Sequence, residues 1–349
     1  MNSISTKRDI DPSSWLAVLG ICGLTVLAAR ALLRKFPRPK FNLQGKVVVI
    51  TGGSRGFGLA LAKEFGSHGA RLALCARDRG ELERARALLE KEGLEAHIYA
   101  ADIADAGEIG NLVTRITSEL GGIDVLVNNA GSIEVGSFDA VTHKDFEDSM
   151  NLMFWAPVNL TYAVLPLMRA RGSGHIVNIS SVGGRVSIPH LLPYCCAKFA
   201  LTGFSTGLGT ELKQHGIQVL TVAPGLMRTG SYLNAEFKGA SEKEFTWFAL
   251  LGNLPGFSVS ADYAAAGVRE ALERGEPVCT ISLPAKVLIG MEAIAPDVNR
   301  TVLELVDRYA LPHSGEKDSR TGKTLDSPLN LLFQSLTRLG KLAAVRLNE

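Results

Sequence analysis

The chain has 349 residues, of which 46% are hydrophobic, and its 37 basic and 35 acidic side chains leave a net charge of +2. This length suffices for one large α/β domain with extensions, and the balanced charge provides no basic field that would indicate a nucleic-acid partner. The five cysteines form no pair with metal-ligand or redox spacing, so we expect free thiols in a reducing compartment and no metal site.

An apolar segment near the N-terminus predicts attachment to a membrane. Residues Ser13–Ala29 carry no charge, and a helix over Trp15–Leu33 would be about 28 Å long, close to the thickness of a bilayer core. The single segment predicts a single-pass membrane protein, and the positive-inside rule predicts that its main domain faces the cytoplasm. A cleavable signal peptide and a buried helix remain as alternatives. The basic residues that set this orientation are Arg30, Arg34, Lys35, Arg38 and Lys40.

Short β-branched runs alternate with helical stretches from Gly45 to about Leu283. This order is typical of a parallel, doubly wound sheet, so we predict a Rossmann-type α/β domain with seven strands. We expect a membrane anchor and basic linker at 1–44, the Rossmann domain at 45–290 and a helical C-terminal extension at 291–349. The predicted strands are Val47–Thr51, Arg71–Cys75, Ala96–Ala100, Val125–Asn128, His175–Ser180, Gln218–Val222 and Val278–Ile281.

A glycine-rich turn follows the first predicted strand. Gly52, Gly56 and Gly58 have the spacing G-x-x-x-G-x-G and lie directly before a helix. Glycines let the backbone turn tightly and approach a pyrophosphate, which rests on the start of the helix. Alone, such a turn is also compatible with a simple strand-to-helix connection.

Further motifs follow this turn in a fixed order. Asp102 comes after the third predicted strand, Asn128-Asn129-Ala130-Gly131 after the fourth, and Pro224-Gly225 with Thr229 after the sixth. Together with the glycine spacing, these motifs resemble the short-chain dehydrogenase/reductase family, over Gly45 to about Leu283. The resemblance implies a nicotinamide dinucleotide cofactor, with Asp102 near the adenine and Pro224, Gly225 and Thr229 near the nicotinamide amide.

Charge favours NADP(H) over NAD(H). Enzymes that use NAD place an acid after the second strand to bind the ribose 2′-hydroxyl, but this chain has Ala76-Arg77 there. Arg77, with Arg55 from the glycine turn, would suit a 2′-phosphate, although both could simply be solvated surface arginines. The full predicted cofactor site is Thr51, Gly52, Ser54, Arg55, Gly56, Phe57, Gly58, Arg77, Asp102, Ile103, Asn129, Ala130, Gly131, Tyr194, Lys198, Pro224, Gly225 and Thr229.

Four residues form the predicted catalytic group. Tyr194 and Lys198 are four positions apart and share a helix face, and Ser181 lies thirteen residues before the tyrosine. By the family resemblance, Asn151 completes a tetrad with these three. Each residue taken alone has an ordinary structural explanation, but their combination with the cofactor motifs indicates a catalytic site.

The chemistry of carbonyl reduction explains these residue types. A forming alkoxide needs a proton, which tyrosine can give, and a neighbouring ammonium would lower the pKa of the phenol from about 10. The resemblance implies that Lys198 also binds the nicotinamide ribose, that Ser181 bonds the carbonyl oxygen, and that Asn151 holds a proton-relaying water. We therefore expect an oxidoreductase that transfers a hydride between NADP(H) and a carbonyl or secondary alcohol. The alternative is a catalytically idle dinucleotide-binding sensor or scaffold at the membrane.

The stretch from Gly230 to about Phe257 is rich in apolar side chains. It predicts a lid over an apolar small-molecule substrate, with a helix pair packing on its own core as the alternative. The identity of the substrate and the direction of the reaction stay open, and a homo-oligomer is possible.

The C-terminal region predicts a polar, mobile loop at Ser314–Thr324 and a helix at Ser327–Asn348. An apolar stripe with basic residues beside it would suit an anionic membrane surface, whereas an ordinary terminal helix would dock on the enzyme or a second subunit. The stripe comprises Leu329, Leu332, Phe333, Leu336, Leu339, Ala343 and Leu347.

Overall fold

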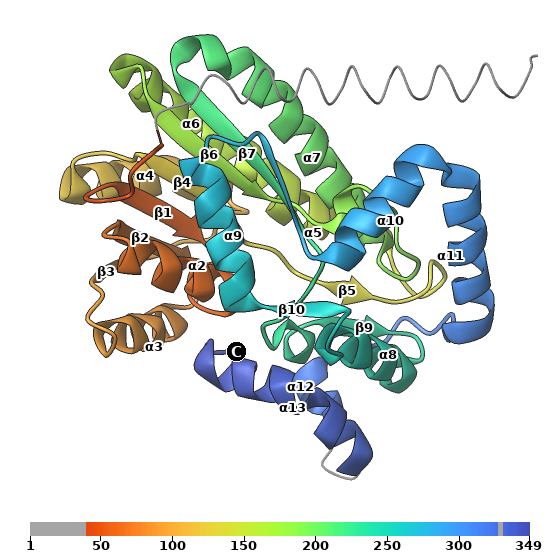
Figure 1. Ribbon diagram of the computed structural model, residues 1–349. Helices are drawn as coiled ribbons and strands as arrows, with labels where there is room; N and C mark the ends of the chain where they lie inside the picture. Colours follow the sequence, from red (N-terminus) through yellow and green to blue (C-terminus); the bar gives the residue numbers. More distant parts are fainter. Residues whose placement is uncertain (1–39, 327–330) are drawn as a thin grey trace, which may run out of the picture. The chain divides into compact units, whose positions relative to one another are not determined.

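The computed structural model describes residues 40–326 and 331–349, and Phe41–Glu349 form one compact unit. Its centre is a seven-stranded, fully parallel sheet with the strand order β11-β7-β6-β4-β1-β2-β3 (Figure 1). The predicted Rossmann-type sheet is confirmed. The strands are β1 Val47–Thr51, β2 Arg71–Ala76, β3 Ala96–Ala100, β4 Val125–Asn128, β6 Gly174–Ile179, β7 Ile217–Pro224 and β11 Val278–Ile281.

Helices cover both faces of the sheet because the buried strands are apolar on both sides. Along β1, Val48 and Ile50 belong to one core cluster and Val47 and Val49 to the other, as the alternation of side chains along a strand requires. The first cluster is closed by α2 Gly56–Ser67, α3 Arg79–Glu90 and α9 Ala261–Glu273, and the second by α4 Ala106–Leu120, α6 Ala156–Arg171 and the end of α7 Leu192–Leu212.

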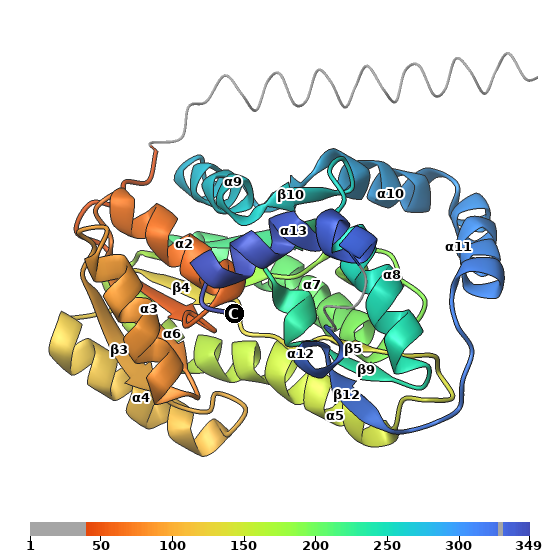
Figure 2. The same ribbon diagram turned by 90° about the horizontal axis from the view of Figure 1, so that it is seen from below.

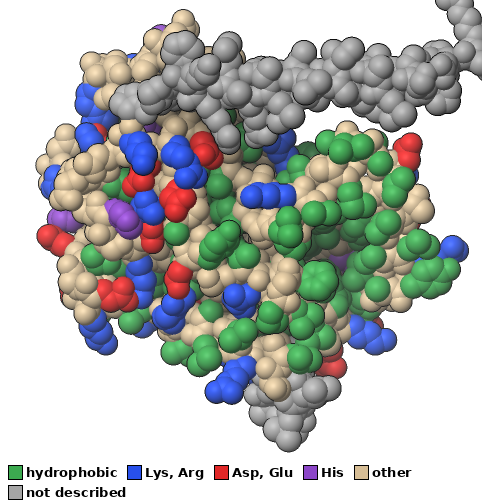
Figure 3. All heavy atoms as spheres, in the orientation of Figure 1, with side chains coloured by type: hydrophobic (Ala, Val, Ile, Leu, Met, Phe, Trp, Pro, Cys, Tyr) green, Lys and Arg blue, Asp and Glu red, His purple; other side chains and the backbone are tan. Residues whose placement is uncertain are grey.

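The surface divides by side-chain type. Hydrophobic side chains gather over the two helices that follow the last strand, α10 Leu283–Ile294 and α11 Pro296–Ala310, whereas charged side chains gather over α2 and α9 (Figure 3). The exposed apolar side chains of α10 and α11 are Leu283, Val287, Ile294, Val298, Val302, Leu305, Val306 and Tyr309.

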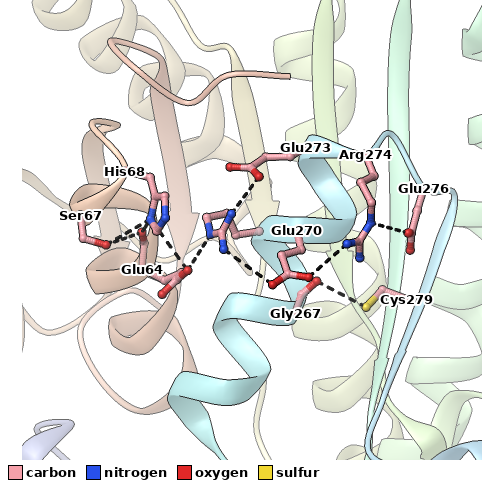
Figure 4. Close-up of polar contacts among 10 residues, drawn as sticks. Glu64, Ser67, His68, Gly267, Glu270, Glu273, Arg274, Glu276 and Cys279 are labelled. Carbon is pink, nitrogen blue, oxygen red and sulfur yellow. Dashed lines mark hydrogen bonds and ion pairs between the residues drawn. The ribbon is translucent and has the colours of Figure 1, made fainter. Parts of the chain in front are cut away.

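Ion pairs fasten α9 to α2. Arg269 Nε donates to Glu64 Oε1 of α2 at 2.6 Å, and Arg269 Nη1 donates to Glu273 at 2.8 Å. Figure 4 shows Glu64 and Glu273 on two sides of this arginine. A further ion pair joins Arg274 Nε to Glu276 Oε1 at 2.7 Å. Because the Arg269 side chain is only 15% exposed, this network lies in the contact between the helices. It holds α2, which starts at the glycine turn, against α9.

Two small sheets extend the domain beside the carboxyl ends of the main strands. One pairs β8 Leu226–Arg228 with β10 Ser258–Ser260, and the other has the order β12-β9-β5. The prediction of a mobile loop at 314–324 is wrong, since Ser319–Thr321 form the strand β12 and Gly322–Leu325 form the short helix α12. The polar residues of β12 form an antiparallel edge strand on β9 Glu236–Lys238, which in turn lies beside β5 Glu134–Val135.

The C-terminal helix α13 Leu331–Arg346 lies against α8 Ser241–Asn253 (Figure 2). The docked arrangement is the one observed, and the predicted apolar stripe is only partly buried by it, since Leu336 and Leu339 are 41% and 47% exposed. The helices approach closely because glycine lies between them: a Cβ on Gly340 would collide with the side chain of Asn253. The stripe residues Ala343 and Leu347 are buried, together with Thr337 and Ala344.

The predicted membrane anchor lies outside the described residues. Within residues 40–326 and 331–349, no helix is both long enough and apolar enough to cross a bilayer.

Candidate active site

The glycine turn at the end of β1 has a geometry that only glycine permits. Gly52 and Gly56 have φ angles of +63° and +55°, in the left-handed region. A Cβ on Gly58 would lie 2.0 Å from the Gly52 carbonyl oxygen, and one on Gly52 would lie 2.9 Å from Ala130 Cα. No side chain caps the start of α2, and of its first backbone N–H groups that of Gly56 donates to the Leu347 carbonyl oxygen at 2.9 Å.

Thr51 and Asn129 join this turn to the end of β4. The Thr51 hydroxyl accepts hydrogen bonds from the backbone N–H groups of Asn129 at 3.0 Å and Ala130 at 3.1 Å. Asn129 Nδ2 donates to the carbonyl oxygens of Thr51 at 3.0 Å and Gly52 at 3.2 Å. The glycine turn and the Asn128–Gly131 segment therefore hold each other's backbone in place. Thr51 contributes to the site by positioning these two segments.

A cleft of about 450 Å³ lies over the carboxyl ends of the strands, where ligands bind in open α/β sheets. Every predicted cofactor residue except Thr51 lines it. The cleft, the glycines without room for a side chain and the open start of α2 together fit a dinucleotide. Several other residues line the cleft without a signal in the sequence, among them Glu81, Ile133, Ser180, Ser231 and Glu349.

The two predicted phosphate-binding arginines differ in their surroundings. Arg77 is exposed at the end of β2 and lines the cleft. Arg55 Nη1 lies 2.9 Å from Glu81 Oε1 and 3.2 Å from Asn234 Oδ1, and the Ser54 hydroxyl donates to Glu81 at 3.0 Å. Glu81 therefore neutralises Arg55 in this structure, so a phosphate would have to draw Arg55 away from it.

Ser181, Tyr194 and Lys198 meet at the inner end of the cleft, as expected. Tyr194 and Ser181 are joined by a side-chain hydrogen bond, and the Ser181 oxygen also accepts from the Gly183 N–H at 3.0 Å. Lys198 Nζ lies 5.7 Å from the centre of the Tyr194 ring and donates to the Ile179 carbonyl oxygen at 2.7 Å. Ser181 thus caps the short helical turn Val182–Gly184 and faces the tyrosine as well.

The expected lowering of the tyrosine pKa by Lys198 is not found. Burial raises the pKa of Tyr194 to about 12, although the bond with Ser181 opposes this. Burial also lowers the pKa of Lys198 to about 8. Both shifts have the same cause, because a poorly solvated site disfavours the charged form of each group. At neutral pH Tyr194 therefore holds its proton.

Asn151 lies in a turn that contacts α7, the helix that carries Tyr194 and Lys198. It begins a π-helical turn, Asn151–Trp155, its carbonyl oxygen accepts from the Ala156 N–H, and the residue is exposed. It does not line the cleft, which its neighbour Leu152 does. Such π-turns are frequent at functional sites, and the water-holding role of the Asn151 side chain stays a prediction.

An apolar cavity of about 410 Å³ adjoins the cleft, and Ser181 and Tyr194 line both. The stretch predicted as a lid both lines this cavity and packs on a core of its own. Its inward side chains form a separate cluster that includes Tyr232, Phe237, Phe245 and Phe248. The apolar side chains lining the cavity include Ile133, Val182, Ile188, Leu191, Leu226, Met227, Trp247, Phe248, Leu251, Phe257 and Leu288.

A buried histidine ties the lid helix α8 to α11. His190 Nδ1 lies 2.7 Å from Glu244 Oε1 of α8, and His190 Nε2 lies 3.2 Å from Asp307 Oδ1 of α11. Trp247 Nε1 also donates to Glu244, at 2.6 Å. Ligand atoms of His190, Asp307 and His313 lie within 4.8 Å of one another. Since a carboxylate already faces each ring nitrogen of His190, we assign this group a structural role.

Comparison with known proteins agrees with this geometry. The family profile described as short chain dehydrogenase matches residues 46–236. The dehydrogenase/reductase SDR family protein 7-like of Drosophila melanogaster is 32% identical over 309 residues, covering 85% of this chain and 92% of the relative. The 17-beta-hydroxysteroid dehydrogenase 13 of Mus musculus is 34% identical over 224 residues, covering 62% of this chain and 72% of the relative.

Solved structures agree as well. A metagenomic short-chain oxidoreductase in complex with NADP matches with a TM-score of 0.56 and 30% identity, covering 70% of this chain and 98% of that one. The chain therefore belongs to the short-chain dehydrogenase/reductase family and is an oxidoreductase with a Rossmann-type fold.

Proposed function

We propose that the protein is an NADP(H)-dependent reductase of carbonyl groups on apolar molecules. The observation that carries this proposal is the position of Ser181 and Tyr194, whose side chains line both the dinucleotide cleft and the apolar cavity. A carbonyl held at this junction has polar hydroxyl groups on one side and an apolar chamber around the rest of the molecule.

The side chains divide the reaction between them. The bound dinucleotide would supply the hydride for the carbonyl carbon. Ser181 would donate a hydrogen bond to the carbonyl oxygen, and Tyr194, which holds its proton at neutral pH, would protonate that oxygen as charge develops on it. Lys198 lies beside the tyrosine ring and lines the same cleft, where its ammonium would bind the ribose and stabilise the phenolate that proton transfer leaves.

The cavity supports an apolar substrate. Its walls are mainly aliphatic and aromatic, and α10 contributes Pro284 and Leu288 to them. The same helix exposes Leu283, Val287 and Ile294 to solvent, so apolar surface continues outward from the cavity wall. A relative named for 17-beta-hydroxysteroids is compatible with a substrate of this kind.

A screen of NADPH oxidation in detergent tests the proposal. Ketones and aldehydes of increasing apolar size should be reduced with kcat/KM rising until the cavity of about 410 Å³ is filled. Small polar sugars serve as the comparison. If sugars are reduced well and apolar carbonyls are not, the proposed substrate class is wrong.

Arg77→Asp should shift cofactor preference from NADPH toward NADH. The change removes a cation from the end of β2 and places an acid where a ribose 2′-hydroxyl would lie. Arg79→Asp is a matched control, because Arg79 is exposed, pairs with Glu83 and does not line the cleft. The ratio of kcat/KM for the two cofactors measures the effect. Equal shifts in both variants, or a wild type that prefers NADH, would contradict the role of Arg77.

We also propose that residues 15–33 anchor the protein in a membrane, with the catalytic domain on the cytoplasmic side. The support is the uncharged apolar segment and the basic residues that follow it. Deletion of residues 1–40 leaves the compact unit Phe41–Glu349 intact and should move the protein to the soluble fraction with dinucleotide binding retained. A deleted protein that still sediments with membranes would indicate another attachment.

A further inference from the structure

The segment Leu347–Glu349 lies against the glycine turn. Leu347 is fully buried in the main core, and its carbonyl oxygen accepts from the Gly56 N–H at 2.9 Å. Asn348 Nδ2 donates to the carbonyl oxygens of Ser54 at 2.8 Å and Glu81 at 3.1 Å. Figures 1 and 2 both show the end of α13 beside the start of α2.

Glu349 brings a carboxylate into the cleft. It lines the cleft, its side chain is only 5% exposed, and it lies so close to Gly56 that a Cβ there would collide with it. Oε2 accepts from Asn234 Nδ2 and lies 3.7 Å from Arg55 Nε. Burial raises the pKa of Glu349 to about 7, with Arg55 and Lys323 opposing the shift and Glu81 adding to it.

These contacts are the ones that a cofactor phosphate would need. The open start of α2 and the guanidinium of Arg55 form an anion site in which the Glu349 carboxylate now lies. The Glu349 carboxylate and a cofactor phosphate would repel each other in this poorly solvated site. A single arginine and one helix end cannot neutralise both anions. The backbone donor of Gly56 is likewise taken by Leu347.

We propose that Glu349 is an affinity-determining residue of the dinucleotide site, whose carboxylate competes with the cofactor phosphates for Arg55 and the start of α2. Dinucleotide binding then displaces Leu347–Glu349 from the glycine turn, so the affinity for cofactor includes the cost of releasing this segment. This role of Glu349 rests on the proposed dinucleotide site. Glu349 lies outside residues 46–236, the part of the chain that the family profile matches.

Glu349→Gln removes the charge and keeps the size of the side chain, so it tests the competition directly. Calorimetric titration with NADPH at pH 8, where Glu349 is ionised, should give a Kd lower by about fivefold or more. Glu304→Gln is the control, since it makes the same charge change on the exposed face of α11 and should leave Kd unchanged. An unchanged or higher Kd for Glu349→Gln would overturn the proposal.

Hydrogen exchange of the wild type gives a second readout that needs no substitution. Amide exchange in residues 343–349 should speed up when NADPH is added, because the segment leaves the turn. Slower exchange would mean that the segment closes over the cofactor, and the proposal would fail. A wild type that binds neither NADPH nor NADH would overturn the dinucleotide site itself, whereas NADPH binding without these responses would overturn only the competition.

Discussion

Tyr194→Phe is expected to lower kcat for carbonyl reduction by at least about a hundredfold, with the Kd for NADPH within about twofold of the wild type. The variant loses only the hydroxyl group that would protonate the carbonyl oxygen. The ring stays in place between the cleft and the apolar cavity, both of which Tyr194 lines. Steady-state kinetics and calorimetric titration of the same preparation separate the two effects.

Tyr263→Phe is the matched control for this experiment. Tyr263 lies on α9 with 64% of its surface exposed, so loss of its hydroxyl should leave both kcat and Kd unchanged. If Tyr194→Phe keeps activity within a few fold of the wild type, another group supplies the proton and the assignment of Tyr194 fails.

Gly58→Ala should abolish dinucleotide binding and destabilise the domain. The added Cβ would lie 2.0 Å from the Gly52 carbonyl oxygen and 2.7 Å from Asn129 Nδ2, so the turn would have to open and release the Asn129 contacts. We expect the Kd for NADPH to rise at least about a hundredfold and the free energy of unfolding to fall by about 2 kcal/mol or more. Titration and urea unfolding measure these two quantities.

Gly110→Ala makes the same chemical change where there is room. Gly110 lies in the middle of α4, and a Cβ there would meet nothing within 4 Å. The substitution should raise the free energy of unfolding by up to about 1 kcal/mol, because alanine favours a helix, and leave NADPH binding unchanged. NADPH binding by Gly58→Ala at wild-type affinity would show that the glycine turn does not hold the dinucleotide.

The seven strands of the main sheet were predictable because each is a short, mainly apolar run next to a helical stretch. Strand β1 begins with Val47, Val48, Val49 and Ile50, which are buried on both faces, and its one polar residue, Thr51, comes at its end. The small sheets were not predictable. Polar strand β12 pairs with β9, which lies about eighty residues earlier in the chain, and Ser319–Thr321 alone resemble a loop.

The site was predictable where spacing along one element determines position. Tyr194 and Lys198 share a helix, and the glycine turn is a single connection. Contacts between distant segments could not be read in this way: Glu81 at Arg55, His190 between α8 and α11, and Glu349 at Gly56. The pKa of Tyr194 was mispredicted for a related reason, because the sequence indicated the neighbouring lysine but not the burial of both groups.

Transfer of deuterium from NADPH that carries deuterium in place of both hydrogens at C4 of the nicotinamide tests the central claim most directly. The claim is that hydride passes from this cofactor to an apolar carbonyl held at Ser181 and Tyr194. Mass spectrometry of the product should find one deuterium on the carbinol carbon with the wild type, and almost none over the same time with Tyr194→Phe. Bound NADPH without deuterium in the product of any apolar carbonyl would contradict the account.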